Sequence, residues 1–146
     1  MKEKSILWWI IFILLCIWQL PQLLVALVML PFLGKIKLIG DRHYNFCFES
    51  EEMSGGISLG PLAYVSKYLA MNKAGVAHEL DGHTVQSKIL GPLYLFVIGI
   101  PSIVWAMTSG NKCYYSFYTE SWANKCANLE VDEYCDLKFK INNDSK

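Results

Sequence analysis

The chain has 146 residues, of which 53% are hydrophobic and only 18% are charged. Lysine plus arginine and aspartate plus glutamate number 13 each, so no summed charge attracts nucleic acid, and nucleic-acid binding is not expected. The length allows one small folded unit, and the excess of apolar residues favours additional membrane anchors.

The first apolar segment carries no charged residue from Ser5 to Gly34. Within it, the stretch from Ile6 to Leu33 is interrupted only by two glutamines and two prolines, and a membrane span needs about 20 apolar residues. A signal peptide has a shorter apolar core and a cleavage site of small residues, so an uncleaved anchor is expected. Pro21, flanked by glutamines, predicts a kink and packing against a second helix.

Residues 35–88 begin with a strand pattern. Lys35 to Ile39 alternates, Gly40-Asp41 signals a turn, and His43 to Phe48 alternates again, so a strand pair is expected. The stretch from Gly55 to Val65 predicts a further strand, bulged at Gly60-Pro61. This part of the chain therefore predicts a small antiparallel strand region.

A helix is expected from about Asn72 to Lys88, with Asn72 as its N-cap and Gly91-Pro92 as its terminator. It contains the sequence HELDGH, which places two histidines beside acidic residues on one short helix. Zinc peptidases place two such histidines four residues apart, with a glutamate between them that serves as the base. The helix therefore predicts a metal site of irregular spacing.

The two histidines of this helix, His78 and His83, are five residues apart. On a regular α-helix they diverge, and Glu79 and His83 are the natural ligand pair because four residues separate them. A π-bulge seated at Gly82 would instead bring His78 and His83 together. The sequence leaves both geometries open.

The second apolar stretch, Ile89–Met107, is broken by Gly91-Pro92 and by Pro101. We expect a short second span, with a re-entrant or buried helix as the alternative. Residues 108–146 predict an aromatic-rich helix and a frayed, solvated tail after Cys135. Free thiols are expected for the five cysteines, although Cys126 and Cys135 could close a small loop.

Four stretches support a resemblance: GGISLG from Gly55, GHTVQS from Gly82, GPLYLFVIGIPS from Gly91 and YTESWANK from Tyr118. In these the chain resembles a group of small predicted bacterial membrane proteins with a zincin-like core, whose helix carries H-E-x-G-H. The resemblance covers residues 55–125, about half of the chain.

The resemblance implies zinc as cofactor and His83 and Glu120 as metal ligands. If His78-Glu79 is aligned with the first half of the motif, His78 becomes a ligand and Glu79 the catalytic base, with one extra residue between the halves. If Gly82-His83 is aligned instead, Glu79 replaces the first histidine and the base is lost. An aromatic-rich helix packed at the membrane surface, with Glu120 facing water, is the alternative for the second ligand helix.

These observations predict an α+β membrane protein with one long N-terminal span, one short Pro-broken span, a small antiparallel strand region and a zincin-like helix. The expected segments are residues 1–34, 35–88, 89–107 and 108–146. The expected function is a multi-pass protein of the bacterial inner membrane, in contact with the lipid bilayer, with a degenerate zinc site related to metallopeptidases. A non-catalytic membrane protein that binds a peptide or protein partner, or has a structural role, is the alternative.

Overall fold

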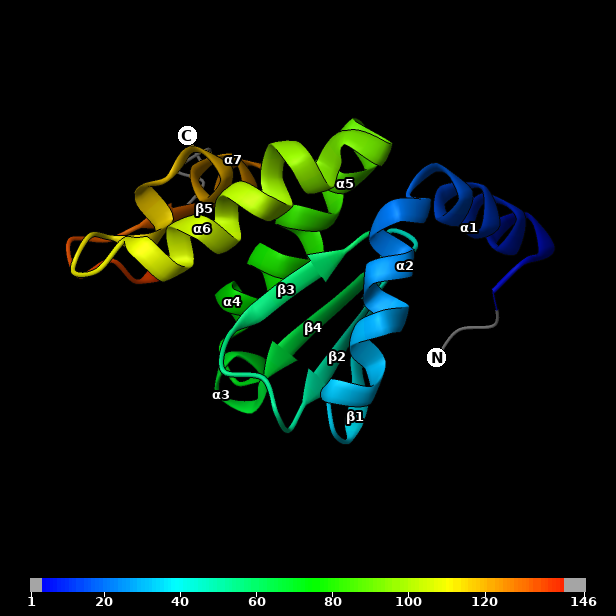
Figure 1. The fold of residues 1–146 in the computed structure, drawn as a ribbon, viewed down its shortest axis with the longest axis horizontal. Coiled ribbons are helices and arrows are strands. Elements are labelled where there is room, and N and C mark those ends of the chain that lie inside the picture. Colours follow the sequence, from blue (N-terminus) through cyan, green and yellow to red (C-terminus); the bar gives the residue numbers. More distant parts are fainter. Residues whose placement is uncertain (1–3, 141–146) are drawn as a thin grey trace, which may run out of the picture.

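A computed structural model describes residues 4–140 of the chain (Figure 1). Its α-helices are α1 (Ile6–Trp18), α2 (Leu20–Met29), α3 (Lys67–Ala70), α4 (Lys73–Ala77), α5 (Thr84–Leu90), α6 (Ile100–Thr108) and α7 (Tyr118–Cys126). The short 3₁₀-helices are η1 (Leu30–Phe32), η3 (Gly91–Leu93) and η5 (Tyr114–Ser116), and the π-helices are η2 (His78–His83) and η4 (Leu95–Gly99). The strands are β1 (Ile36–Arg42), β2 (Asn45–Ser50), β3 (Gly56–Leu59), β4 (Leu62–Ser66), β5 (Leu129–Val131) and β6 (Leu137–Phe139).

The larger sheet has the strand order β1-β2-β4-β3. Its outer pairs are antiparallel, but β2 and β4 run parallel, so the predicted purely antiparallel region is wrong. The physical reason is that Gly60, with φ +67°, forms a tight turn with Pro61 instead of a bulge. The turn folds the segment into a β3–β4 hairpin, and β4 inserts beside β2 while β3 becomes the edge strand.

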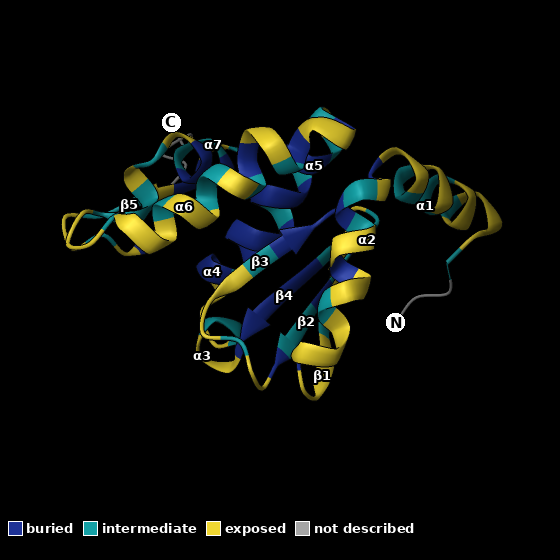
Figure 2. Ribbon diagram, in the orientation of Figure 1, coloured by how far each residue is buried: buried dark blue, intermediate teal, exposed yellow. Residues whose placement is uncertain are grey.

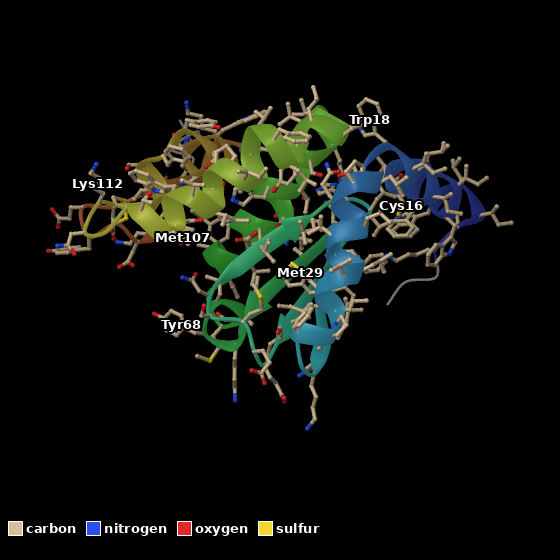
Figure 3. The ribbon with its side chains drawn as sticks, in the orientation of Figure 1. Cys16, Trp18, Met29, Tyr68, Met107 and Lys112 are labelled. Carbon is tan, nitrogen blue, oxygen red and sulfur yellow. A yellow bond between two sulfur atoms is a disulfide. The ribbon has the colours of Figure 1, made fainter. Side chains whose placement is uncertain are left out.

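Helices cover both faces of this sheet (Figure 1). On one face, α2 contributes Ala26 to a core with Leu59 and Tyr64, and Met29 of α2 points toward the sheet (Figure 3). On the other face, Leu80 of η2 packs against Val65 and its neighbours in the sheet. The HELDGH segment is therefore held against the centre of the molecule.

The expected N-terminal span is not a single helix. The pair α1 and α2 is bent by 88° at Gln19. Pro21 lies in the first turn of α2, where its missing N–H costs no hydrogen bond, and the buried Gln22 side chain donates to Ser87 Oγ at 3.3 Å. The predicted kink and contact with a second helix are thus present, but they divide the segment into two short helices.

The second apolar segment is also divided, because Lys73–Leu93 and Leu95–Thr108 are bent by 120°. Gly91, three residues before the break at Tyr94, has φ +51°, and a Cβ there would lie 2.3 Å from the ring of Trp18. Within residues 4–140, no single helix is both long and apolar enough to cross a membrane, and each bent pair reaches that length and hydropathy only when its halves are counted together. The predicted fold class, with one long and one short span, is corrected accordingly.

The C-terminal part also differs from the prediction. Cys113 forms a disulfide with Cys135, which ties the segment after α6 to the β5–β6 hairpin, whereas Cys126 is free. The prediction of free thiols at Cys113 and Cys135 is therefore wrong, and so is the alternative of a disulfide between Cys126 and Cys135. Strand β6 lies in the stretch predicted as a frayed tail, and the last six residues of that tail, 141–146, lie outside the described residues.

Candidate metal centre

The HELDGH segment forms the π-helix η2 between α4 and α5. Asn72 caps the start of this helical stretch, as predicted, by accepting hydrogen bonds from the backbone N–H groups of the first turn of α4. A π-turn aligns residues five apart, so the rings of His78 and His83 lie with centroids 4.7 Å from each other. Of the two geometries left open by the sequence, the structure has the π-helical one.

Gly82 allows η2 to approach α7 closely. A Cβ at this position would lie 2.8 Å from the carbonyl oxygen of Ala123 on α7. The absence of a side chain therefore brings the two helices together at the level of the histidines.

Glu120, on α7, completes the convergence. Its Oε2 lies 3.0 Å from Nε2 of His78 and 3.2 Å from Nε2 of His83. The side chain is fully buried, so the alternative in which it faces water is wrong. The structure thus brings together His78 and His83 of the HELDGH segment and Glu120, which the resemblance implied as a ligand, from two helices about 40 positions apart.

Amide side chains hold the outer edges of both imidazoles. Nδ1 of His83 lies 2.7 Å from Oε1 of Gln86, whose Nε2 donates to the carbonyl of Thr119 at 2.7 Å. Nδ1 of His78 lies 2.7 Å from Oδ1 of Asn124. Because amide oxygens only accept, each Nδ1 carries a proton, and each Nε2 faces Glu120, where it can hold a second proton or bind a metal ion.

The second oxygen of Glu120 is held separately. Its Oε1 accepts hydrogen bonds from Ser102 Oγ at 2.8 Å and Thr119 Oγ1 at 3.0 Å. The carboxylate is therefore fixed with Oε2 facing the two imidazoles. Two nitrogen lone pairs and a carboxylate oxygen that meet in a buried site repel one another unless a cation, a proton or a metal ion, lies among them.

The ionisation of the site follows from this arrangement. Burial lowers the pKa of His83, but its hydrogen bond to Glu120 and the charges of Glu79 and Glu120 outweigh burial and raise the pKa to about 9. Burial raises the pKa of Glu120, yet the hydrogen bonds from His78 and His83 outweigh it and hold that pKa well below its usual range. Glu120 is therefore anionic at neutral pH.

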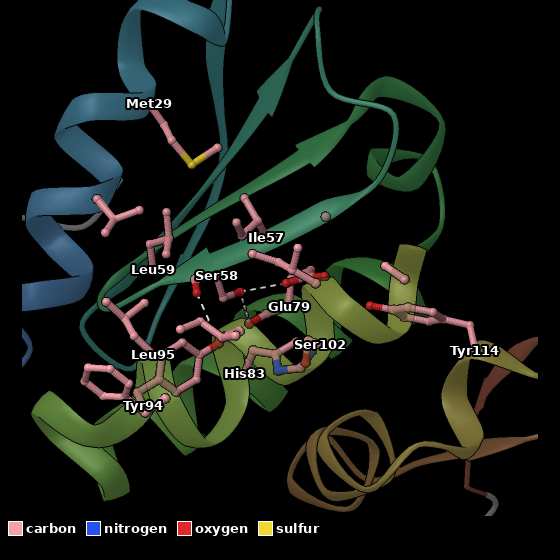
Figure 4. Close-up of a pocket in the computed structure, with 17 residues that line it drawn as sticks. Met29, Ile57, Ser58, Leu59, Glu79, His83, Tyr94, Leu95, Ser102 and Tyr114 are labelled. Carbon is pink, nitrogen blue, oxygen red and sulfur yellow. Dashed lines mark hydrogen bonds between the residues drawn. The ribbon is translucent and has the colours of Figure 1, made fainter. Parts of the chain in front are cut away.

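Glu79, the predicted base, is buried beside the histidines but faces the sheet (Figure 4). Its Oε2 accepts a hydrogen bond from Ser58 Oγ at 2.7 Å, and a Cβ on Gly56 would lie 2.3 Å from its Oε1. Ligand atoms of His78, Glu79 and His83 all lie within 4.8 Å of one another. This buried group could therefore hold a metal ion.

The sequence did not identify the residues that orient the ligands. Gln86 follows His83 by three positions and Asn124 follows Glu120 by four, spacings that place side chains on one helix face. Those spacings were the available signal, whereas Ser58 and Ser102 come from elements whose positions only the fold reveals.

The candidate site is thus built from η2, α5 and α7, with β3 and α6 at its margin. Comparison of the chain with protein-family models, with curated proteins and with solved structures finds no match. The functional interpretation consequently rests on the geometry of the centre, and the resemblance to zincin-like proteins stays a prediction.

Proposed function

We propose that this chain is a zinc-dependent hydrolase that cleaves peptide bonds. The observation that carries the proposal is the convergence of His78 Nε2, His83 Nε2 and Glu120 Oε2, with a second carboxylate, Glu79, beside them. Two neutral imidazoles and one carboxylate form a common ligand set of catalytic zinc sites, which leaves the fourth position for water or substrate.

The distances support a small divalent ion. Zinc bonds of about 2.0–2.2 Å in a tetrahedron place neighbouring ligand atoms roughly 3.3–3.6 Å apart. Glu120 Oε2 lies 3.0 and 3.2 Å from the two imidazole nitrogens, so an expansion of a few tenths of an ångström would admit the ion. The nitrogen and oxygen donors favour zinc over calcium or magnesium, which prefer oxygen ligands alone.

In this proposal Glu79 is the general base. Its carboxylate lines the cavity beside the histidines, and the bond from Ser58 fixes its orientation. When bound, zinc acidifies a coordinated water and polarises a carbonyl group. Glu79 would accept the proton of that water, while Glu120, held by Ser102 and Thr119, stays a ligand.

The edge strand supports a peptide as substrate. Gly55 O accepts a hydrogen bond from Ser66 N, so the backbone groups of the alternate residues Gly56 and Ser58 point away from β4. Both residues line the cavity that contains Glu79 and His83. The carbonyl oxygen of Ser58 accepts a hydrogen bond from the hydroxyl of Tyr94 at 3.1 Å, so an extended peptide would pair with this edge mainly through the backbone of Gly56 and so be held in line with the centre.

We also propose that the apolar surface of α1 contacts lipid. No charged residue lies between Ser5 and Gly34, and large side chains such as Leu14 and Ile17 are 59% and 64% exposed. Such a surface is unfavourable in water, and most of α1 and α6 is exposed in Figure 2.

In flotation with phosphatidylcholine vesicles, the double variant Leu14→Asp and Ile17→Asp should lose most of its binding, whereas Tyr68→Asp, at an 80% exposed position on α3, should not. Equal flotation of both variants would contradict this assignment.

The enzymatic proposal is tested by zinc content and peptide cleavage measured on the same preparations. We expect one zinc per chain and cleavage of an unstructured protein substrate, with products identified by mass spectrometry. Glu79→Gln should keep the zinc and lose cleavage by about 100-fold or more, since a general base contributes 10²–10⁴-fold. Glu120→Gln should lose both, and Glu130→Gln, at an exposed position on β5, should lose neither. Bound zinc without cleavage by the unaltered chain would overturn the peptidase and leave a non-catalytic metal protein.

A further inference from the structure

A cavity of about 410 Å³ opens beside the candidate metal centre (Figure 4). It lies between the edge strand β3, helix α2 and the η4–α6 segment, and Glu79 and His83 form part of its wall. The volume falls near the lower end of the range of about 300–1,000 Å³ that is usual for ligand pockets. The space therefore suits one or two side chains and not a folded partner.

The walls of this cavity differ sharply in chemistry. Near the metal centre they carry Glu79, His83 and the hydroxyl groups of Ser58 and Ser102. Away from it they are aliphatic and aromatic, with Met29 of α2 among the contributors. A molecule bound here would present a polar, reacting group at one end and an apolar group at the other.

Charge is confined to the end of the cavity at the metal centre. Among the described residues that line it, the ionisable ones are Glu79, His83, Tyr94 and Tyr114. Burial raises the pKa of both tyrosines above their usual value, so both are neutral. A lysine or aspartate side chain inserted into the apolar part would lose its hydration without meeting an opposite charge.

We infer that this cavity is the specificity pocket of the enzyme and that it selects a large apolar side chain next to the cleaved peptide bond. The inference rests on the proposed function, because it assigns the substrate of the same centre. Ile57 and Leu59 of the edge strand point their side chains toward α2, so a peptide paired with β3 would lie beside the apolar walls. Leucine, methionine or phenylalanine would bury most of its surface there.

The selectivity expected from such a pocket is moderate. A difference in buried apolar surface of one or more methylene groups changes kcat/KM by about 10–200-fold. We expect cleavage of a peptide with leucine or phenylalanine at the selected position to exceed that of the aspartate counterpart by that factor. The zinc content of the enzyme should not depend on the peptide.

Ala106 provides a variant that fills the pocket. It lies on α6, lines the cavity and is exposed, so Ala106→Trp would block the space without disturbing a packed core. Met107→Trp places the same side chain at the next position, which is 81% exposed and does not line the cavity. The pair separates loss of the pocket from the presence of an added indole.

The experiment uses the zinc-loaded full chain and two blocked peptides, acetyl-Ala-Leu-Phe-Ala-amide and acetyl-Ala-Asp-Asp-Ala-amide. Binding is measured by calorimetry with Glu79→Gln, and cleavage is measured with the unaltered chain. The apolar peptide should bind and react at least tenfold better, and Ala106→Trp, but not Met107→Trp, should remove that preference while zinc stays bound. Apolar-selective binding without cleavage would support the pocket and overturn the peptidase. Cleavage or binding of both peptides alike would overturn the pocket.

Discussion

Gln86 offers a quantitative test of how the metal ligands are oriented. Its amide oxygen holds Nδ1 of His83 at 2.7 Å and its amide nitrogen donates to Thr119 O at 2.7 Å, in a fully buried position. Gln86→Leu keeps the bulk of the side chain but removes both hydrogen bonds. His83 then loses the partner that fixes its tautomer, so Nε2 no longer has a fixed lone pair toward the metal.

Loss of such an outer partner costs about 10–100-fold in metal affinity, or about 1.4–2.8 kcal/mol. Gln22→Leu is the matched control, because Gln22 is equally buried and donates to Ser87 Oγ and Gly91 O without touching a ligand. Both variants should lose about 1–3 kcal/mol of unfolding free energy. Zinc affinity, measured by competition with a chromophoric chelator, should fall at least tenfold only in Gln86→Leu. Equal zinc affinities in the two variants would refute the role of Gln86.

Three further predictions concern pH, the disulfide and the helix contact. The pKa of His83 is raised from 6.5 to about 9 in the zinc-free protein, so its contribution to stability is complete below about pH 6.5 and is lost as the pH rises through 9, whereas zinc affinity rises over the same interval. The free energy of unfolding, measured against pH, should therefore fall in chelator-treated samples and rise in zinc-loaded ones. Parallel slopes would contradict this prediction. Reduction of the disulfide Cys113–Cys135, which closes a loop of 22 positions, should lower the free energy of unfolding by about 3 kcal/mol. Denaturant unfolding with and without reductant measures this difference, and an unchanged free energy would refute the prediction. Gly82→Ala should lower the free energy of unfolding by about 1–3 kcal/mol and reduce zinc binding, because its Cβ would press on the backbone of α7. Gly40→Ala, with open space around it, should retain zinc binding. Equal zinc loss in both variants would argue against the contact between Gly82 and α7.

Part of the candidate site was predictable because three of its residues lie in one local pattern, whereas Glu120 was implied only by the resemblance. The HELDGH sequence identified His78, Glu79 and His83, and the N-cap Asn72 marked where the helix begins. The choice between α and π geometry was not predictable, because it depends on Gly82 packing against α7, about 40 positions further along the chain. A local sequence pattern contains no information about that contact.

The arrangement of the apolar segments was predicted poorly for a related reason. Hydropathy between Ser5 and Gly34 measures how apolar a segment is and how long, but not whether it continues straight. Next to the bend at Gln19, Gln22 contacts Ser87, 65 positions away, and shortly before the bend at Tyr94, Gly91 packs against the ring of Trp18, so both bends lie beside contacts that are distant in the sequence.

The strand pattern had the same weakness. Alternation identified β2 and the β3–β4 region as strands, but a period of two residues does not specify which strand lies beside which. The parallel pairing of β2 with β4 follows from the hairpin turn at Gly60, which sequence analysis interpreted as a bulge. This pairing leaves β3 at the edge, where it lines the cavity.

The most direct test of the metal centre is X-ray absorption spectroscopy of the zinc-loaded full chain. We expect two imidazole nitrogens and a carboxylate oxygen at about 2.0–2.2 Å from one zinc per chain, and no site-bound zinc in Glu120→Gln. A zinc spectrum that is unchanged in Glu120→Gln, or that contains sulfur ligands, would contradict the ligand set of His78, His83 and Glu120.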